Sequence, residues 1–350
     1  MEERSDDGPF PAARLKAAIV FNLKKGVPGA TADMEAEYDN LDTVLAIQKA
    51  LEKGGAETTL AEADDTLPQR LLADRPDIVF NIAEGFRGRG REAQIPALLN
   101  MLGIPFTGSD ETALGIALDK ALCKRLLSTF GVRTPRFAVI ANEADIAAAA
   151  ESLRFPVIVK PNAEGSSKGV SDVCIASDGA ELRRVAAEDL RLYGEPMLAE
   201  EYMDGREFTV GILGNGAETR VFPPMEIRFR SNTQGPYRVY SFGVKKDYKK
   251  YVEYRCPAEL TPEQAREMTD MARTAYDALG CCDFTRVDFR MNREGTIHFI
   301  EMNPLPGLAP GYSDYPMLAE FCGMGYDELV LAVLRAGAKR CGLPEGGGAR

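Results

Sequence analysis

The first third of the chain alternates short apolar runs with segments that have the periodicity of amphipathic helices. Residues 16–23 (KAAIVFNL) and 77–82 (DIVFNI) are rich in strand-forming side chains, whereas residues 41–53 repeat apolar positions at intervals of three and four. This pattern predicts strands at 16–23, 58–61 and 77–82 and helices at 41–53, 67–72 and 93–102. Strands that alternate with helices favour a parallel sheet with helical crossovers, so we assign residues 14–112 to a first, α/β domain.

The rest of the chain is less regular, with neighbouring strands between its helices. We expect a central domain of α+β character over residues 113–213 and a third domain over residues 214–340. The expected helices span 120–130, 144–153, 178–192, 261–279 and 326–340, and the expected strands span 136–140, 155–161, 172–176, 197–201, 208–213, 285–291 and 296–302. The polar segment 231–251 contains glycine and several lysines and has no period, which predicts a mobile loop.

Composition narrows the classes of function. The 350 residues carry a formal net charge of −11, which disfavours nucleic acid or an anionic membrane as a partner, because both attract clustered Lys and Arg. No apolar run approaches the roughly 20 residues that cross a bilayer, so we expect no membrane attachment. Seven dispersed cysteines without a Cys-x-x-Cys pair indicate reduced thiols in a cytoplasm. A single histidine, His298, excludes a histidine zinc cluster and disfavours a Ser-His-Asp triad.

A predicted hairpin near the C-terminus gathers polar side chains on one face. Side chains alternate along strands, and a two- or four-residue turn places Asp288 opposite Phe299 and Glu301 opposite Arg286, with Asn303 on the same face. Two carboxylates and an amide oxygen are hard ligands suited to magnesium. Taken alone, the hairpin is better explained by an exposed sheet face that carries an Arg–Glu pair.

Three further segments have polar groups suited to a nucleotide. Lys160 ends an apolar strand and precedes the small-residue loop 164–170, whose backbone N–H groups and hydroxyls can hold phosphate. Lys120 opens a helix after Asp119, and acidic residues bracket the short segment 200–207. Each segment also has an ordinary explanation: a turn, a solvated lysine or an acidic hairpin.

These segments occur in a distinctive order. From the N-terminus they are Asp119-Lys120, Val159-Lys160-Pro161, Glu164-Gly165-Ser166-Ser167, Glu200 with Glu207, Arg286-x-Asp288 and Glu301-x-Asn303-x-x-Pro306-Gly307. The series resembles the ATP-grasp ligases, and most of all the D-alanine–D-alanine ligase family, over about residues 16–337. The resemblance implies an ATP-grasp fold of three domains, with ATP held between the central and the C-terminal domains.

The resemblance also implies roles for individual residues. The residues implied to contact ATP are Lys120, Lys160, Ser166, Ser167, Glu200, Tyr202, Met203, Glu207 and Lys245. The implied ligands of two magnesium ions, with Mn²⁺ as an alternative, are Asp288, Glu301 and Asn303. The implied catalytic groups are Arg286 and the backbone N–H of Gly307, which would meet a tetrahedral oxyanion, together with Ser166 and Glu37.

The implied reaction has two steps. ATP converts a carboxylate into an acyl phosphate, and an amine then attacks the acyl carbon to form an amide. The homodimer that we expect is also implied by the resemblance.

The sequence departs from the family mainly where the amino acids would bind. Glu37 is our replacement for a family glutamate after the first strand, Glu84 stands where the family has histidine, and Lys246 follows Lys245 where tyrosine is usual. The family's serine near the second carboxylate falls at Tyr312 or Ser313. We therefore expect substrate contacts from Glu37, Glu84, Lys246, Tyr312 and Ser313. A cationic substrate, or a salt bridge to Arg87 or Arg89, would explain Glu84.

Three functions follow from these observations. The first is a dipeptide ligase that acts on D-alanine, and the second is an ATP-grasp tailoring ligase for a different amino acid or amine. The third is a non-catalytic nucleotide-binding protein, which the retained set of Arg286, Asp288, Glu301 and Asn303 disfavours.

Overall fold

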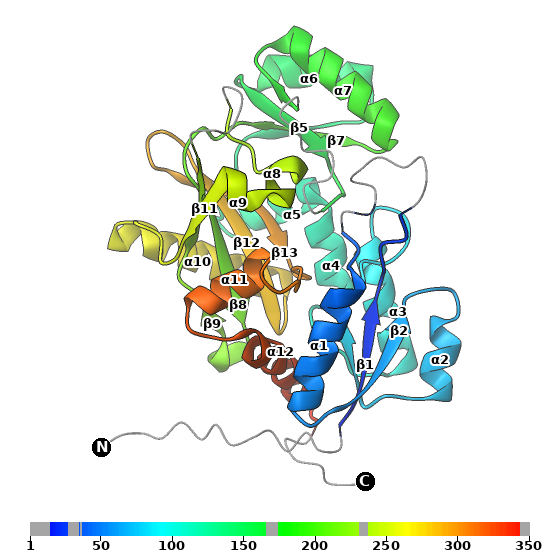
Figure 1. Cartoon of the computed structure of the whole chain (residues 1–350). Helices are drawn as coiled ribbons and strands as arrows, with labels where there is room; N and C mark the ends of the chain where they lie inside the picture. The colour runs from blue at the N-terminus through cyan, green and yellow to red at the C-terminus, as the bar shows by residue number, and fades with distance from the viewer. Residues whose placement is uncertain (1–14, 27–34, 36, 166–173, 231–236, 344–350) are drawn as a thin grey trace.

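The part of the chain that the structure describes forms three β-sheets with helices packed around them (Figure 1). The computed structural model describes residues 15–26, 35, 37–165, 174–230 and 237–343. Figure 1 shows the central sheet at the top, the C-terminal sheet below it and the N-terminal sheet beside the latter. The mixed α/β class predicted from the sequence is therefore confirmed.

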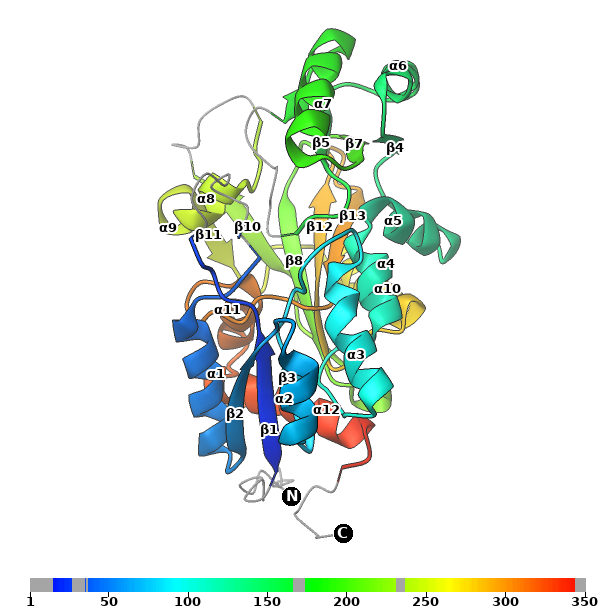
Figure 2. The ribbon, with the colours of Figure 1, turned by 90° about the vertical axis from the view of Figure 1, so that its right-hand side faces the viewer.

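The N-terminal sheet is parallel, as the strand–helix alternation predicts. Its strands have the order β2-β1-β3. The elements are β1 (Lys16–Phe21), α1 (Leu41–Lys53), β2 (Glu57–Glu62), α2 (Leu67–Ala73), β3 (Ile78–Asn81), the 3-10 turn η1 (Arg91–Ala93) and α3 (Gln94–Leu102). Alternate residues of β1 enter different cores: Ile19 packs with α1 and with α12 (Tyr326–Arg340), whereas Val20 packs with α2 and α3. Figure 2 shows this sheet in the lower half of the molecule.

The order of these strands places a crevice at their carboxyl ends. Strand β1 pairs with β2 on one side and with β3 on the other, so the strand order reverses at β1. Ligands of open α/β sheets bind where the strand order reverses in this way. Lys24 after β1 and Glu84 after β3 both line a pocket at this edge.

The central sheet is antiparallel and has the order β4-β7-β5-β6. Its elements are α4 (Glu111–Leu118), α5 (Lys120–Thr129), β4 (Phe137–Ile140), α6 (Glu143–Ser152), β5 (Val157–Pro161), β6 (Ile175–Ala176), α7 (Gly179–Tyr193) and β7 (Met197–Glu201). Helices α6 and α7 cover one face, where Ile146 and Leu182 pack with β5 and β7. The pairing confirms the α+β character predicted for this part of the chain.

The C-terminal sheet is also antiparallel, with the order β11-β10-β8-β12-β13 and with β9 paired to β8. Its elements are β8 (Glu207–Leu213), the 3-10 turn η2 (Gly216–Glu218), β9 (Arg220–Val221), β10 (Met225–Phe229), α8 (Phe242–Lys246), α9 (Tyr248–Tyr251), β11 (Val252–Arg255), α10 (Pro262–Leu279), β12 (Phe284–Met291), β13 (Ile297–Asn303) and α11 (Asp314–Phe321). The domain division expected at residue 213 separates β8 from the sheet to which it is hydrogen-bonded. The division of the chain into three domains stays a prediction.

The described part of segment 231–251 differs from the predicted loop, because it contains α8 and α9. The Ser241 hydroxyl accepts a hydrogen bond from the backbone N–H of Val244, and Val244 packs against Ile227 and Val252. Helices of five and four residues are too short to show a period in the sequence. The sequence also failed to reveal α4, α11, β9, β10 and β11.

The predicted register of the hairpin is wrong by one residue next to the turn and by two residues beyond Ile300. Asp288 lies opposite Glu301 and Arg286 opposite Asn303, whereas Phe289 lies opposite Phe299. The extra residue is Ile300, which forms a β-bulge. A bulge reverses the alternation of side chains, so Phe299 enters the core with Phe289 instead of sharing a face with Glu301.

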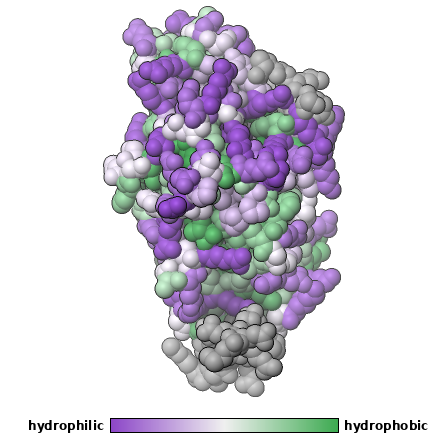
Figure 3. Space-filling view, turned by 90° about the vertical axis from the view of Figure 1, so that its left-hand side faces the viewer, coloured by the Kyte–Doolittle hydropathy of each residue, from purple (hydrophilic) through white to green (hydrophobic). Residues whose placement is uncertain are grey.

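No helix in the described ranges is long and apolar enough to cross a membrane. Figure 3 shows one face of the molecule, on which hydrophilic side chains predominate and apolar ones form small separate patches.

Candidate active site

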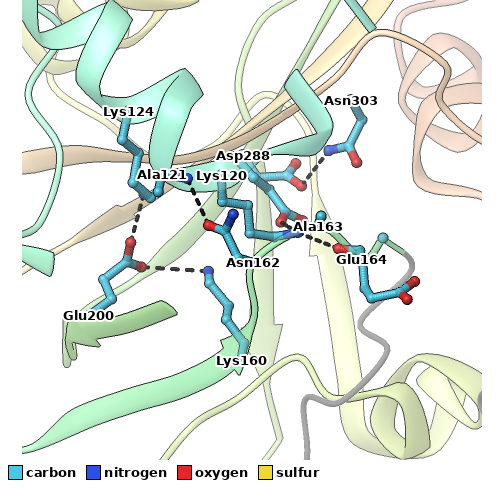
Figure 4. A network of polar contacts seen from close by, with 12 residues as sticks. Lys120, Ala121, Lys124, Lys160, Asn162, Ala163, Glu164, Glu200, Asp288 and Asn303 are labelled. Atoms are coloured by element: carbon cyan, nitrogen blue, oxygen red, sulfur yellow. Dashed lines mark hydrogen bonds and ion pairs between the residues drawn. The ribbon is translucent and has the colours of Figure 1, made fainter. Parts of the chain in front are cut away.

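A buried cluster of charge links α5 to the central sheet. Glu200 on β7 is 2% exposed and forms ion pairs with Lys124 at 2.7 Å and with Lys160 at 3.6 Å (Figure 4). Lys124 also donates to the carbonyl of Phe299, 3.3 Å away, which connects the cluster to β13. The two lysines lower the pKa of Glu200, although burial opposes this shift. Both lysines are thereby held in fixed positions beside the C-terminal sheet.

Lys120 is positioned by the first turn of α5. The Asp119 side chain caps this helix by accepting from the backbone N–H of Leu122 at 3.0 Å, and Asn162 donates to Asp119 at 2.8 Å. The ammonium group of Lys120 donates to the carbonyl of Glu164 and lies 3.7 Å from Glu301. Lys120 and Lys160 therefore face the same space from different elements, as Figure 4 shows.

That space is a pocket between the central and the C-terminal sheets, which we call the lysine pocket. Its polar lining includes Lys120, Lys160, Lys245 and Glu207, and its apolar lining includes Ile158, Met203, Ile227, Val239 and the bulge residue Ile300. A pocket lined by both cations and apolar side chains suits a flat ring that carries phosphate.

Glu207 has a carboxylate oxygen without a donor. Its Oε2 atom is buried and has no hydrogen-bond partner within the described ranges, and Nε of Arg290 is 3.8 Å away. Burial raises the pKa of Glu207 to about 7. Tyr202 is also fixed here, because its hydroxyl donates to the carbonyl of Arg238 at 2.8 Å. A ligand with hydroxyl groups would supply the donor that Glu207 lacks.

The carboxylates expected to bind metal lie side by side at the edge of this pocket. Asp288 and Glu301 are directly opposite each other on β12 and β13, an arrangement that destabilises a sheet unless a cation lies near. Arg286 supplies one such cation through a bidentate pair with Asp288 at 2.9 and 3.0 Å, and Asn303 donates to Asp288 at 3.2 Å. Burial raises the pKa of Asp288, whereas Lys120 and Lys160 lower that of Glu301.

Within the described ranges, no group of three or more His, Cys, Asp or Glu side chains is placed to hold a metal. The predicted set contains two carboxylates and one amide. Such a set fits magnesium, which completes its shell with water and phosphate oxygens.

A second pocket adjoins the first at the edge of the N-terminal sheet, and we call it the acidic pocket. Its lining includes the carboxylates of Glu37, Asp39, Glu84, Glu92, Glu164 and Glu301. Arg91 neutralises two of them: it forms ion pairs with Glu37, Nε to Oε2 being 3.0 Å, and with Glu164 at 2.9 Å. Glu37 also accepts from the backbone N–H of Gly165. The carboxylate of Glu37 is thus already bound by the protein.

The other wall of the acidic pocket is the loop that follows β13. Gly307, Tyr312 and Ser313 line it together with Arg286. The Ser313 hydroxyl accepts from the backbone N–H of Ala309 at 3.1 Å, so the loop turns back on itself. Asp314 follows at the start of α11, is 2% exposed and lies 3.5 Å from Arg286.

Lys120, Lys245, Arg286 and Glu301 line both pockets, so the two pockets meet at these side chains. Burial lowers the pKa of Lys245, whereas its neighbour Lys246 is exposed and lines neither pocket. Glu84 lines the acidic pocket and has no ion pair with Arg87 or Arg89, and Arg89 instead pairs with Asp119 at 2.7 Å. Ser166 and Ser167 lie outside the described residues.

The sequence did not reveal four residues of the site: Lys124, Arg91, Glu92 and Asp314. Lys124 follows Lys120 by four residues, so both lie on one face of α5, and this spacing could have revealed it. Asp314 begins a helix that the sequence did not predict. The other two belong to a polar loop region, where no local pattern separates ligand contacts from surface charge.

Known proteins resemble this chain along nearly its whole length. A family model described as the C-terminus of D-Ala–D-Ala ligase matches residues 126–335. The D-alanine–D-alanine ligase of Pseudomonas fluorescens is 33% identical over 337 residues, which are 95% of this chain and 94% of that protein.

Solved structures show the same fold. One is D-alanine–D-alanine ligase from Bacillus anthracis complexed with ATP, with a TM-score of 0.72, 21% identity, and coverage of 94% of this chain and 99% of that one. Another is the VanG D-Ala:D-Ser ligase from Enterococcus faecalis, with a TM-score of 0.71, 20% identity, and coverage of 93% and 99%.

Proposed function

The chain belongs to the D-alanine–D-alanine ligase family of ATP-dependent carbon–nitrogen ligases, and we propose that it joins an amino-acid carboxylate to an amine through an acyl phosphate. The observation that carries this proposal is the meeting of two pockets at Arg286, Glu301 and Lys245. A nucleotide in one pocket and an acid in the other would bring phosphate and carboxylate together there. Holding both reactants in place supplies a large part of the rate enhancement of such reactions.

The lysine pocket is the proposed site of ATP. Its apolar walls would hold the adenine ring beside Tyr202 and Met203, and the ribose hydroxyls would donate to the unpaired oxygen of Glu207. Lys120, Lys160 and Lys245 would meet the phosphates. Glu200 forms ion pairs with Lys124 and Lys160. Its carboxylate would keep these ion pairs while it also contacts the adenine amine.

Asp288, Glu301 and Asn303 are the proposed holders of magnesium. When bound, magnesium would offset the phosphate charge that otherwise repels a carboxylate. For these ligands to bind it, Arg286 would have to release the Asp288 carboxylate with which it now pairs. Arg286 then becomes free to meet the acid.

Arg286 and the backbone N–H of Gly307 are the proposed donors to the oxyanion that forms when the amine attacks. Arg286 is buried, and burial strengthens its interaction with a developing negative charge. Gly307 lies close to Ser313: a Cβ atom added to Gly307 would be 2.9 Å from the Ser313 hydroxyl oxygen. A side chain at position 307 would therefore crowd Ser313 in this loop.

The test is a measurement of ADP release with ATP, magnesium and pairs of amino acids, D-alanine among them. We expect one ADP and one phosphate for each amide formed, identified by mass spectrometry. Asp288→Ala and Glu301→Ala should abolish turnover with ATP binding retained, whereas the exposed-site control Glu57→Ala should keep it. ATP binding without amino-acid-dependent ADP release would contradict the proposal and favour a non-catalytic nucleotide-binding protein.

The homodimer and the cytoplasmic location expected from the sequence stay predictions. Light scattering of the purified protein would measure the mass of the particle and decide between a monomer and a dimer.

A further inference from the structure

Three carboxylates of the acidic pocket have no partner among the residues that the structure describes. Asp39 follows β1, Glu84 follows β3 and Glu92 belongs to η1, so three separate segments bring them to one pocket. Within the described ranges, none of the three makes a hydrogen bond or ion pair through its side chain. Glu92 is only 8% exposed and still lines the pocket. A carboxylate that is buried without a donor or a cation requires another group to compensate it.

Most of the nearby cations are already engaged, and Lys245 stands at the junction with the lysine pocket. Arg91 is bound by Glu37 and Glu164, and Lys120 donates to the carbonyl of Glu164. Lys24 lines the same pocket but is exposed and forms no ion pair with Asp39 in the part of the chain that the structure describes. The protein therefore leaves a surplus of negative charge at this end of the pocket.

The chemistry of these three groups reflects that surplus. Burial is the main cause that raises the pKa of Asp39 to about 7 and that of Glu92 to about 8, and it raises the pKa of Glu84 as well. Carboxylates at Glu37 and Glu92 add to the effect on Glu84. A cation placed among them would reverse these shifts, because it favours the charged form of each carboxylate.

The position of the surplus charge identifies the ligand. The same pocket contains Arg286 and Gly307, the groups proposed to meet the reacting carboxylate. An amino acid bound by its carboxylate at Arg286 brings one ammonium group, which can compensate only part of three carboxylates. Further compensation requires a second cationic group on the same molecule.

On the basis of the proposed function, we propose that the amino acid whose carboxylate is activated carries a cationic side chain, as ornithine, 2,4-diaminobutyrate or arginine does. Glu84 and Glu92 hold the side-chain cation, and Asp39 holds the α-ammonium group. Neutral amino acids of the same size bind more weakly because they leave the carboxylates uncompensated.

The test compares cationic amino acids with neutral ones of matched shape, in both enantiomers and each paired with alanine as the amine. Ornithine is compared with norleucine and arginine with citrulline, since each pair differs mainly in charge. Because hydrogen bonds between the side-chain cation and the carboxylates are strong, kcat/KM should be about tenfold or more higher for the cationic member of each pair. Fragmentation of the product by mass spectrometry identifies which residue supplied the acyl group.

The variant Glu84→Gln keeps the shape of the side chain and removes its charge. The ratio of kcat/KM for ornithine to kcat/KM for norleucine should therefore fall by about tenfold. Glu57→Gln, an exposed substitution on β2, is the matched control and should leave the ratio unchanged. ADP release that is equal or faster with norleucine and citrulline would overturn this inference and leave the ligase function standing. ADP release with no amino acid at all would overturn both.

Discussion

The two pockets differ in the sign of the charge that the protein leaves uncompensated. In the lysine pocket the deep carboxylate, Glu200, is held by Lys124 and Lys160, and further cations stand at the junction. In the acidic pocket, Arg91 compensates Glu37 and Glu164, whereas Glu84 and Glu92 have no partner in the described part of the chain. One pocket is therefore prepared for an anion and its neighbour for a cation.

The difference shows how a ligand would lie across the junction. An amino acid has a carboxylate at one end and a cation at the other, so opposite charges in adjoining pockets would orient it. The carboxylate would then point toward the lysine pocket, where the phosphates are proposed to bind. Substitutions in the two pockets should therefore alter different quantities.

The largest effect is expected from Lys124→Met, because this substitution leaves Glu200 with only the longer ion pair to Lys160, at 3.6 Å. Lys124 is completely buried and lies 2.7 Å from Glu200. Removing one partner of a buried ion pair costs about 3–5 kcal/mol in the free energy of unfolding. Urea denaturation measures this change, and the exposed Lys49→Met is the control, expected to stay within about 0.5 kcal/mol. A loss below about 1 kcal/mol would mean that the lysine pocket does not depend on this pair.

Arg286→Ala should have the next largest effect, and it acts on catalysis. The variant removes a buried donor at the junction of the pockets, and loss of one oxyanion donor lowers kcat about 10²–10³-fold. Steady-state ADP release measures kcat and KM separately. Arg273→Ala, which removes a partly exposed Arg–Asp pair on α10, should leave both constants unchanged. A rise in KM alone would show that Arg286 only binds the acid.

The sequence predicted the lysine pocket better than the acidic pocket, for a physical reason. Lys120, Lys160 and Glu207 each stand at the end of a helix or strand, where local pattern already fixes their position. The acidic pocket depends on how distant segments meet: Arg91 pairs with Glu37 and with Glu164, both far away along the chain. Such contacts leave no local pattern in a sequence.

The hairpin shows the same limit within a single element. Its two strands and its polar face could be predicted from alternation, because alternation is a local property. The bulge at Ile300 could not, although the bulge and the turn together place Asp288 opposite Glu301 instead of Phe299. One inserted residue changes which carboxylates meet, and only the pairing of the whole strand reveals it.

A smaller effect is expected from pH, through Glu207 in the lysine pocket. Its pKa rises from 4.5 to about 7 on folding, chiefly through burial, with Asp288, Glu301 and Asp314 adding and Arg290 opposing. The folded protein therefore holds a proton that the unfolded chain releases, so stability falls as pH rises from 4.5 to 7, by up to about 3 kcal/mol.

Glu207→Gln should remove this dependence. Urea denaturation should give the variant the higher free energy of unfolding at pH 8 and nearly the same value as the wild type at pH 4, because other titrating groups are common to both proteins. A nonhydrolysable ATP analogue should reduce the difference at pH 8, since ribose hydroxyls would donate to the charged carboxylate. An unchanged difference would place the ribose elsewhere.

The smallest effect compares two adjacent lysines of α8, and it tests whether the pockets meet where the structure places their junction. Lys245 lines both pockets and Lys246 lines neither, although the two residues share a charge and a helix. Lys245→Met should lower kcat/KM for ATP by about ten- to a hundredfold, the usual value of a hydrogen bond to a charged group, and Lys246→Met should change it less than twofold. Because the helix and the lost charge are the same, a difference between the variants can come only from position. If Lys246→Met lowered kcat/KM more than Lys245→Met, α8 would face the ligands with its other side. The two pockets would then meet at a different place.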